Sequence, residues 1–129
     1  MLVDISNPLD FSKGFPPALT AEYSGHTSLG EQIQAAFPDA RVVKAFNTIG
    51  AAIMTHPGLV KGDHDLFISG NDAAAKATVT ALARSLGWQH VPDLGDIKAA
   101  RAQETIVLVW LQLMGTTGGT LHNLHVARG

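Results

Sequence analysis

The chain has 129 residues, a length that suits one domain and is short for two. Hydrophobic residues make up 46% of it and charged residues 16%, which excludes a disordered or acidic solvating segment. The net charge of −2 predicts no nucleic-acid partner, and the lack of cysteine excludes disulfides and thiolate metal sites. The longest apolar run, Ile106–Leu111, is too short to cross a bilayer. We therefore expect one domain over residues 1–129, located in the cytoplasm with no membrane contact.

The first third of the chain is predicted to hold a strand, a long loop and a helix. Leu2–Ile5 is a compact apolar run that ends before Pro8, which cannot continue a central strand. A loop rich in glycine and proline follows. Ser28–Glu31 has the spacing of a capping box, in which the two side chains bond free amides at a helix start. The helix is expected to end at Phe37, because the next residue is a proline.

Two strands and two helices are expected in the middle of the chain. Arg41–Phe46 is rich in β-branched and aromatic residues and predicts the second strand, followed by a short helix over Ala51–Met54. Asp65–Ser69 predicts the third strand. Ala73–Leu86 has apolar residues at helical spacing, and Asp72 before it can cap the helix.

The last third is predicted to contain a weaker strand and the longest helix. Trp88–Val91 predicts a fourth strand that ends at Pro92. Asp96 can cap a helix over Ile97–Met114. The segment Ile106–Leu111 of this helix is apolar all round, so we expect it to be buried on every side.

The alternation of strands and helices predicts a three-layer α/β fold, with a mostly parallel sheet of about four strands and helices on both faces. In such sheets ligands bind outside the carboxyl ends of the strands. Small polar residues and glycine dominate the predicted strand ends, Ser6–Leu9, Asn47–Ile49, Ser69–Asn71 and Asp93–Gly95. They could let a flat ligand approach the backbone closely, or they could serve only as turn and cap residues.

The sequence offers little support for other chemistries. The histidines include the pair His122 and His125 and one within Gly62–Asp65, but neither place supplies a third metal ligand, so we expect no metal. The Gly-x-Ser-x-Gly elbow of many hydrolases is missing. Gly115–Gly119 follows a helix and lacks the lysine of a phosphate-binding loop. The carboxylates mostly fit helix caps, so no catalytic residue is predicted.

Several segments of the chain match a known pattern in order and spacing. They are Val3–Phe11, Ser28–Gln34, Pro38–Thr48, Phe67–Asp72, Leu86–Trp88, Asp93–Gly95, and Ala99–Arg101 with Glu104. With these segments the chain resembles the second half of the deazaflavin (coenzyme F420)-dependent NADP reductase family. It resembles, more distantly, the cytoplasmic reductase domain of the eukaryotic metalloreductases. The match extends over essentially the whole chain.

The resemblance implies a partial Rossmann-like fold that binds NADP(H) by its nicotinamide end and passes hydride to or from coenzyme F420 or a similar acceptor. It places a set of residues beside the nicotinamide: Asn7, Pro8, Leu9, Asn47, Thr48, Ile49 and Ala51. It places Trp110, Met114 and Gly115 on the substrate side. Asn7 and Asn47 are expected to orient the carboxamide or the ring edge, and Pro8 and Ile49 to form an apolar floor.

One departure from the family pattern bears on activity. Family members begin with a strand and a glycine-rich turn that holds the dinucleotide phosphates, and this sequence contains no Gly-x-Gly-x-x-Gly. We therefore expect a truncated protein that lacks the phosphate-binding half and is incomplete as an enzyme on its own. The alternative is a non-catalytic α/β module that keeps the fold, self-associates and binds no dinucleotide tightly.

Two surfaces predict self-association. By the resemblance, strand Leu2–Ile5 would lie inside a larger sheet, so here it would leave an open edge that can pair with another strand. The apolar segment Ile106–Leu111 also needs cover. We expect a homodimer or a domain-swapped oligomer through one of these surfaces.

Overall fold

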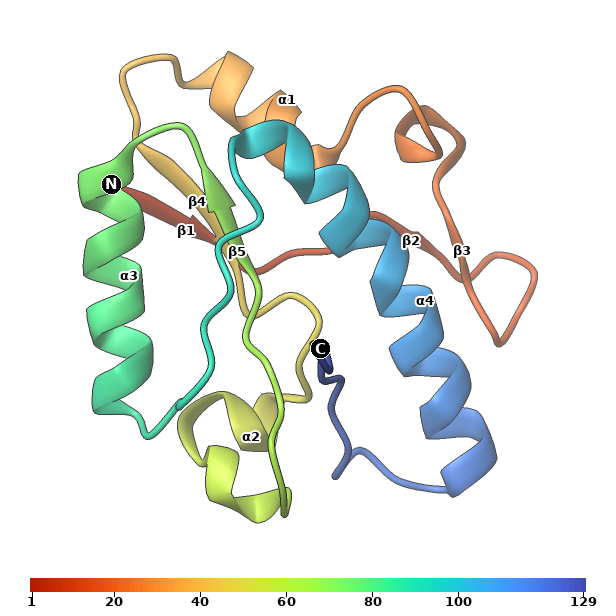
Figure 1. Cartoon of the computed structure of the whole chain (residues 1–129). Helices are drawn as coiled ribbons and strands as arrows, with labels where there is room; N and C mark the ends of the chain where they lie inside the picture. The colour runs from red at the N-terminus through yellow and green to blue at the C-terminus, as the bar shows by residue number, and fades with distance from the viewer.

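A computed structural model describes all residues, 1–129 (Figure 1). Its strands are β1 (Leu2–Asp4), β2 (Leu9–Asp10), β3 (Ala18–Leu19), β4 (Val42–Ala45) and β5 (Ile68–Gly70). Its α-helices are α1 (Leu29–Ala36), α2 (Ala51–Thr55), α3 (Ala73–Ser85) and α4 (Ala100–Thr117). Short 3-10 helices span Ala21–Tyr23, Pro57–Leu59 and Ile97–Ala99. The chain is thus a mixed α/β structure.

The main sheet has three strands in the order β1-β4-β5 and differs from the expected one in direction and in strand number. β1 and β4 are parallel, with Asp4 opposite Lys44, but β4 and β5 are antiparallel. The segment expected as a fourth strand, Trp88–Val91, forms only one isolated parallel bridge, His90 to Asp65, and Asp93 beyond it forms another, to Ile68. The prediction of a mostly parallel, four-stranded sheet is therefore not met.

The antiparallel direction of β5 follows from its connection to β4. A parallel return requires a crossover that carries a helix along the face of the sheet. Here the connection contains only the five-residue α2 and a 3-10 turn, and α2 lies beyond the end of the sheet (Figure 1). The chain therefore re-enters the sheet from the end at which it left.

Helices cover both faces of the sheet, as expected. α3 packs on one face, where Val43 and Ala45 of β4 meet the buried Val79 and Ala83. α1 and the start of α4 cover the opposite face, where Val42 packs in a cluster with Ile97 and Ala100. Figure 1 shows the sheet between these two helical layers. All four residues of β4 are buried, because it is the central strand.

The caps of α1 and α3 lie where the sequence predicted them. Ser28 Oγ accepts a hydrogen bond from the amide of Glu31 at 3.1 Å and donates one to its carboxylate at 2.8 Å. Asp72 accepts from the amide of Ala75 at 2.7 Å. These bonds satisfy amides that the first turn of each helix leaves free.

α4 departs from the prediction at its apolar segment. Val107, Trp110 and Leu111 are buried, but Val109 is 51% exposed. Ile106–Leu111 is therefore not buried on every side, because α4 packs through one face and leaves the opposite one uncovered.

The loop before α1 also contains an unpredicted two-stranded hairpin, β2 with β3. No helix of the chain combines the length and the apolar character needed to span a membrane.

Candidate functional site at the ends of β1 and β4

The carboxyl ends of the parallel strands β1 and β4 are joined through two asparagine side chains. Asn7 Nδ2 donates to the carbonyl oxygen of Asn47 at 2.7 Å, and Asn47 Nδ2 donates to Asn7 Oδ1 at 2.9 Å. These residues are 40 positions apart in the sequence. Two residues that the resemblance placed beside a ligand thus lie together, and each fixes the other.

The turn after β4 is buried and conformationally unusual. Phe46 has a φ of 62°, in the left-handed region that non-glycine residues rarely adopt. Every residue from Val42 to Gly50 is buried, so the surrounding core holds this turn in place. Residues in such conformations often occur at functional sites. The turn thereby sets the position of Asn47, Thr48 and Ile49.

Gln103 of α4 forms hydrogen bonds that hold the turn after β4. The second amide hydrogen of Asn47 goes to the carbonyl oxygen of Gln103 at 3.0 Å. The Gln103 side chain donates to the carbonyl of Phe67 at 3.1 Å and accepts from the hydroxyl of Ser69. It therefore ties α4 to the segment that carries β5. The amide hydrogens of Asn47 are fully used within the protein.

A buried charged cluster lies next to these amides. The ammonium of Lys44 lies 2.8 Å from carboxylate oxygens of both Asp4 and Glu104, and all three side chains are at most 3% exposed. Glu104 also accepts from the amides of Leu29 and Gly30 at 2.9 Å, at the start of α1. Because one ammonium faces two carboxylates, these amides help balance the negative charge of Glu104. The cluster joins β1, β4, α1 and α4 beneath the strand ends.

Of the predicted substrate-side residues, Trp110 and Met114 lie near this end of the sheet and Gly115 does not pack with them. A Cβ added to Gly50 would lie 3.1 Å from the indole of Trp110, so the two residues are in close contact. Leu9 and Met114 pack against the cluster that contains Trp110. Gly115 instead packs under the ring of Phe15, to which an added Cβ would be 2.8 Å. Ala51, the first residue of α2, is exposed.

His122 is a residue of this region that sequence reasoning missed. Its ring stacks on Trp110, with the centroids 4.6 Å apart and the planes at 28°. His122 Nε2 lies 3.0 Å from the carbonyl oxygen of Trp110, which can only accept, so Nε2 carries the proton. Nδ1 is buried without a partner. No local sequence pattern predicts this contact, because the segment after α4 has no regular secondary structure.

The same C-terminal segment is anchored further along. Asn123 Nδ2 donates to the carbonyl of Asp65 at 3.0 Å and lies 3.1 Å from His64 Nδ1. The carboxylate of Asp65 accepts from the amide of Val126 at 2.7 Å and lies 3.3 Å from His125 Nδ1. The segment therefore crosses the front of Trp110 and is tied to the stretch just before β5.

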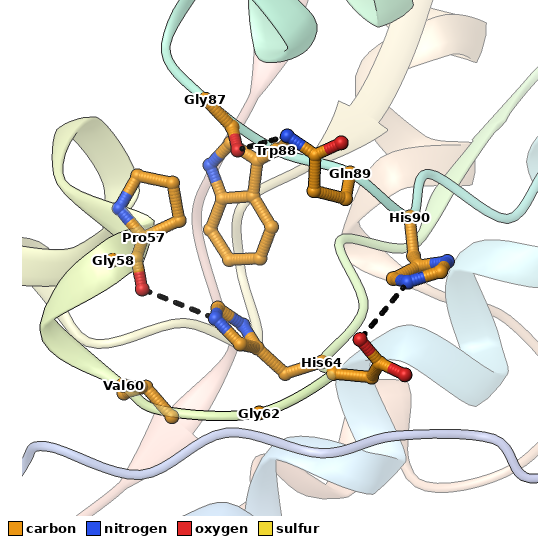
Figure 2. Close-up of a pocket in the computed structure, with 10 residues that line it drawn as sticks. Pro57, Gly58, Val60, Gly62, His64, Gly87, Trp88, Gln89 and His90 are labelled. Carbon is orange, nitrogen blue, oxygen red and sulfur yellow. Dashed lines mark hydrogen bonds and ion pairs between the residues drawn. The ribbon is translucent and has the colours of Figure 1, made fainter.

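The chain also has a small pocket of about 130 Å³ behind His64 (Figure 2). His64 Nε2 lies 3.1 Å from the carbonyl oxygen of Pro57, and its ring meets Trp88 edge-on at 4.9 Å. His90, on the rim, lies 3.5 Å from Asp63. None of the residues predicted beside a ligand lines this pocket. Nowhere in the chain do three or more metal-binding side chains gather as a metal site requires.

The contact between α1 and α4 perturbs one carboxyl group. Arg101 donates from Nε and Nη2 to the two oxygens of Glu31 at 2.8 and 2.6 Å. These bonds lower the pKa of Glu31 below its usual 4.5, and partial burial opposes them. The Arg101 side chain is 41% exposed and that of Glu31 15%, and the pair links α1 to α4.

Comparison with solved structures identifies a close relative. A candidate F420-dependent NADP reductase from Arthrobacter sp. FB24 is 53% identical, with a TM-score of 0.93 over 98% of this chain. The chain resembles the F420-dependent NADP reductases. A hypothetical protein from Sinorhizobium meliloti is 32% identical over 99% of the chain, with a TM-score of 0.62. The Arthrobacter match confirms the resemblance to these reductases and the Rossmann-like fold class.

Among curated proteins, the metalloreductase STEAP3 of Rattus norvegicus is 34% identical over 108 residues, or 84% of this chain. No protein-family model matches the chain. The chain spans 58% of the Arthrobacter protein, 55% of the Sinorhizobium protein and 20% of the rat protein. The likeness to the F420-dependent NADP reductases therefore concerns about half of their length, a share that fits the predicted C-terminal half.

Proposed function

We propose that this chain forms the nicotinamide side of an NADP-linked oxidoreductase site, with coenzyme F420 or a similar compound as the other hydride carrier. The close likeness to a candidate F420-dependent NADP reductase supports the reaction class. The observation that carries the location is the reciprocal amide pair of Asn7 and Asn47 at the ends of two parallel strands. Ligands of α/β sheets bind at such strand ends.

The structure suggests different roles for the two asparagines. Asn47 is 4% exposed and spends its amide hydrogens on Asn7 and Gln103, so it acts as a positioning residue. Asn7 is half-buried and keeps one amide hydrogen free, so it is the group proposed to bond the nicotinamide carboxamide. Pro8, Thr48 and Ile49 are buried and support the backbone beside it.

The apolar side of the site is proposed to be formed by α4 and the hairpin. Leu9, Met114 and Trp110 form one packed cluster there and would exclude water from the reacting rings. Ala51 and Gly115 would lie at its margins. The bound cofactors supply the redox chemistry themselves, because a hydride carries both electrons and the hydrogen between them. The protein then needs to hold and shield the rings, and no strong acid or base is required.

On this proposal the chain is incomplete as an enzyme on its own. It covers 58% of its reductase relative, and it contains no glycine-rich phosphate loop. We therefore expect weak binding of the nicotinamide end, with a dissociation constant on the order of 1 mM. A partner segment that binds the phosphates would be needed for tight binding of NADP(H) and for turnover.

A titration with nicotinamide mononucleotide, followed by two-dimensional amide NMR, tests the proposal. Shifts should concentrate at Asn7, Asn47–Ala51 and the Trp110 indole N–H. Adenosine 2′,5′-bisphosphate, which carries the other half of NADP, is the matched control ligand and should leave these signals unmoved. The variant Asn7→Ala should weaken binding about fivefold, as loss of one hydrogen bond does, while Gln32→Ala on the exposed face of α1 should not.

The absence of shifts at these residues at several times the expected dissociation constant would count against the proposed site. Shifts confined to the pocket behind His64 would place nicotinamide binding elsewhere in the chain.

A second function, self-association without catalysis, has its own support. Ala102, Ile106, Val109 and Leu113 form a helical stripe on the side of α4 that is not packed on the hairpin, and Val109 is 51% exposed. β1 is also an edge strand of the sheet. We propose a homodimer through one of these two surfaces. Light scattering at micromolar concentration should give twice the monomer mass, and Val109→Lys or Val3→Pro should abolish the dimer, according to which surface is used. A monomer in the unaltered protein contradicts this proposal.

A further inference from the structure

The segment after α4 folds back over Trp110 and Gly50. α4 ends at Thr117, and Gly118, which caps it, has a φ of 74°, so the chain then turns back across Trp110 and Gly50. His122 lies flat on the indole of Trp110, and the carbonyl oxygen of Thr120 would be 3.0 Å from a Cβ added to Gly50. A planar, nitrogen-containing ring of the chain itself therefore covers the end of the proposed site.

This segment leaves buried polar atoms without hydrogen-bond partners. Three buried side-chain atoms in the whole chain lack a hydrogen-bond partner, and two of them, His122 Nδ1 and Asn123 Oδ1, belong to this segment. Each would regain a hydrogen bond with water if the segment moved away. The segment has no helix or strand of its own, and Leu121 and His125 are exposed. Release would restore these two bonds and would break the bonds that hold the segment, so it is opposed by less than the full set of contacts.

Several bonds hold the segment: the amide of Asp65 donates to the carbonyl of Leu124 at 2.8 Å, and Trp110 Nε1 donates to the carbonyl of His122 at 3.2 Å. The side chain of Asn123 adds the contact that we call the latch. Asn123 Nδ2 is shared between the carbonyl of Asp65 and His64 Nδ1, at 3.0 and 3.1 Å. The bond to the Asp65 carbonyl fixes the orientation of the Asn123 side-chain amide, because the amide oxygen in the same place would be repelled by the carbonyl oxygen. Because His64 Nε2 donates to Pro57, its Nδ1 is the acceptor of the pair. The carboxylate of Asp65 adds the bond to Val126.

We propose that Thr120–Val126 is a displaceable strap, and that His122 holds the place of a planar heteroaromatic ring, the nicotinamide, on the face of Trp110. This inference rests on the proposed function for the identity of the ring. Ligand binding then requires the open strap, so the apparent dissociation constant varies inversely with the fraction of open molecules.

Two measurements on the same variants test the strap. Acrylamide quenching of tryptophan fluorescence, with Trp110→Phe used to subtract the Trp88 signal, reports exposure of the Trp110 face. Titration with nicotinamide mononucleotide reports binding. Asn123→Ala opens the latch and His122→Ala removes the stacked ring. Leu121→Ala is the matched control, because its side chain is 59% exposed and lies on the same segment. Circular dichroism confirms that each variant is folded.

Both Asn123→Ala and His122→Ala should raise the quenching of Trp110, with an open fraction about fivefold higher for the latch variant. The dissociation constant for nicotinamide mononucleotide should fall by the same factor, and Leu121→Ala should change neither. Unchanged quenching in both variants overturns the strap, whatever the binding. Increased quenching without tighter binding overturns the assignment of the ring position. Failure of the proposed function is recognised separately, as absence of nicotinamide binding in the unaltered protein and in the opened variants alike.

Discussion

Across the ends of β1 and β4, Asn7 Nδ2 donates to the backbone carbonyl of Asn47 at 2.7 Å and Asn47 Nδ2 donates to Asn7 Oδ1 at 2.9 Å. The pair links a half-buried side chain to one that is almost completely buried. Movement of either strand end is therefore transmitted to the other. This relationship makes the proposed site sensitive to changes that do not touch a ligand.

The variant Asn47→Ala should destabilise the fold by about 1–3 kcal/mol, because it leaves Asn7 Oδ1 and the buried carbonyl of Gln103 without their donor. Urea unfolding followed by circular dichroism measures the change. Gln112→Ala, on the exposed side of α4, is the control and should stay within about 0.5 kcal/mol of the unaltered protein. Equal effects of the two substitutions would contradict the role assigned to Asn47.

Lys44→Met should cost more than Asn47→Ala. The substitution keeps the volume but leaves the carboxylates of Asp4 and Glu104 buried without their shared cation. Removing one partner of a buried ion pair typically costs about 3–5 kcal/mol. Lys98→Met, at an exposed position, serves as the control in the same urea experiment. A small effect at Lys44 would show that the carboxylates take up protons or water at little cost.

The pair of Glu31 and Arg101 should make stability depend on pH in a predictable direction. The folded-state pKa of Glu31 is depressed, so its contribution is present above the unfolded pKa and is lost as the pH falls through the folded one. Glu31→Gln should therefore lower the melting temperature at pH 7, and this difference should shrink as the pH falls well below 4.5. A difference that stays constant down to pH 2 would argue against the ion pair as its cause.

Gly50→Ala should disturb the contact between the strand end and the C-terminal segment. The backbone at Gly50 has a φ of −63°, which alanine accepts, so the effect is purely steric. The new methyl group would meet the carbonyl of Thr120 and the indole of Trp110 at 3.0 and 3.1 Å. We expect a loss of about 1 kcal/mol and faster hydrogen exchange over residues 120–126. Gly58→Ala, with open space around it, should show neither change.

Local signals were sufficient for most helices and insufficient for the sheet. Asp72 and the apolar spacing after it predicted α3 to within one residue of its end, since caps and periodicity act within a few positions. The direction of β5 depends on where the connection from β4 travels, which is a property of the whole fold. The hairpin of β2 and β3 was missed for a related reason, because each strand has only two residues.

The candidate site divides in the same manner. The strand ends at Asn7 and Asn47 were predicted from the fold pattern and the family resemblance, and the structure brings them into contact. The apolar run around Trp110 was expected to be buried, yet the residue that stacks on it, His122, follows α4 in a segment without periodicity. The charged cluster around Lys44 was also missed, because a lysine in a strand is ordinarily read as an exposed residue.

Because the Lys44 side chain is completely buried, the reactivity of its amine can be used to measure how often this part of the protein opens. The other lysines lie at exposed or partly exposed positions, where an amine-reactive reagent can reach them. The Lys44 amine is sealed between Asp4 and Glu104, so it reacts only when β1, β4 and α4 come apart. Timed labelling and mass spectrometry of the peptide that contains Lys44 would therefore give the rate of that separation in the unaltered chain.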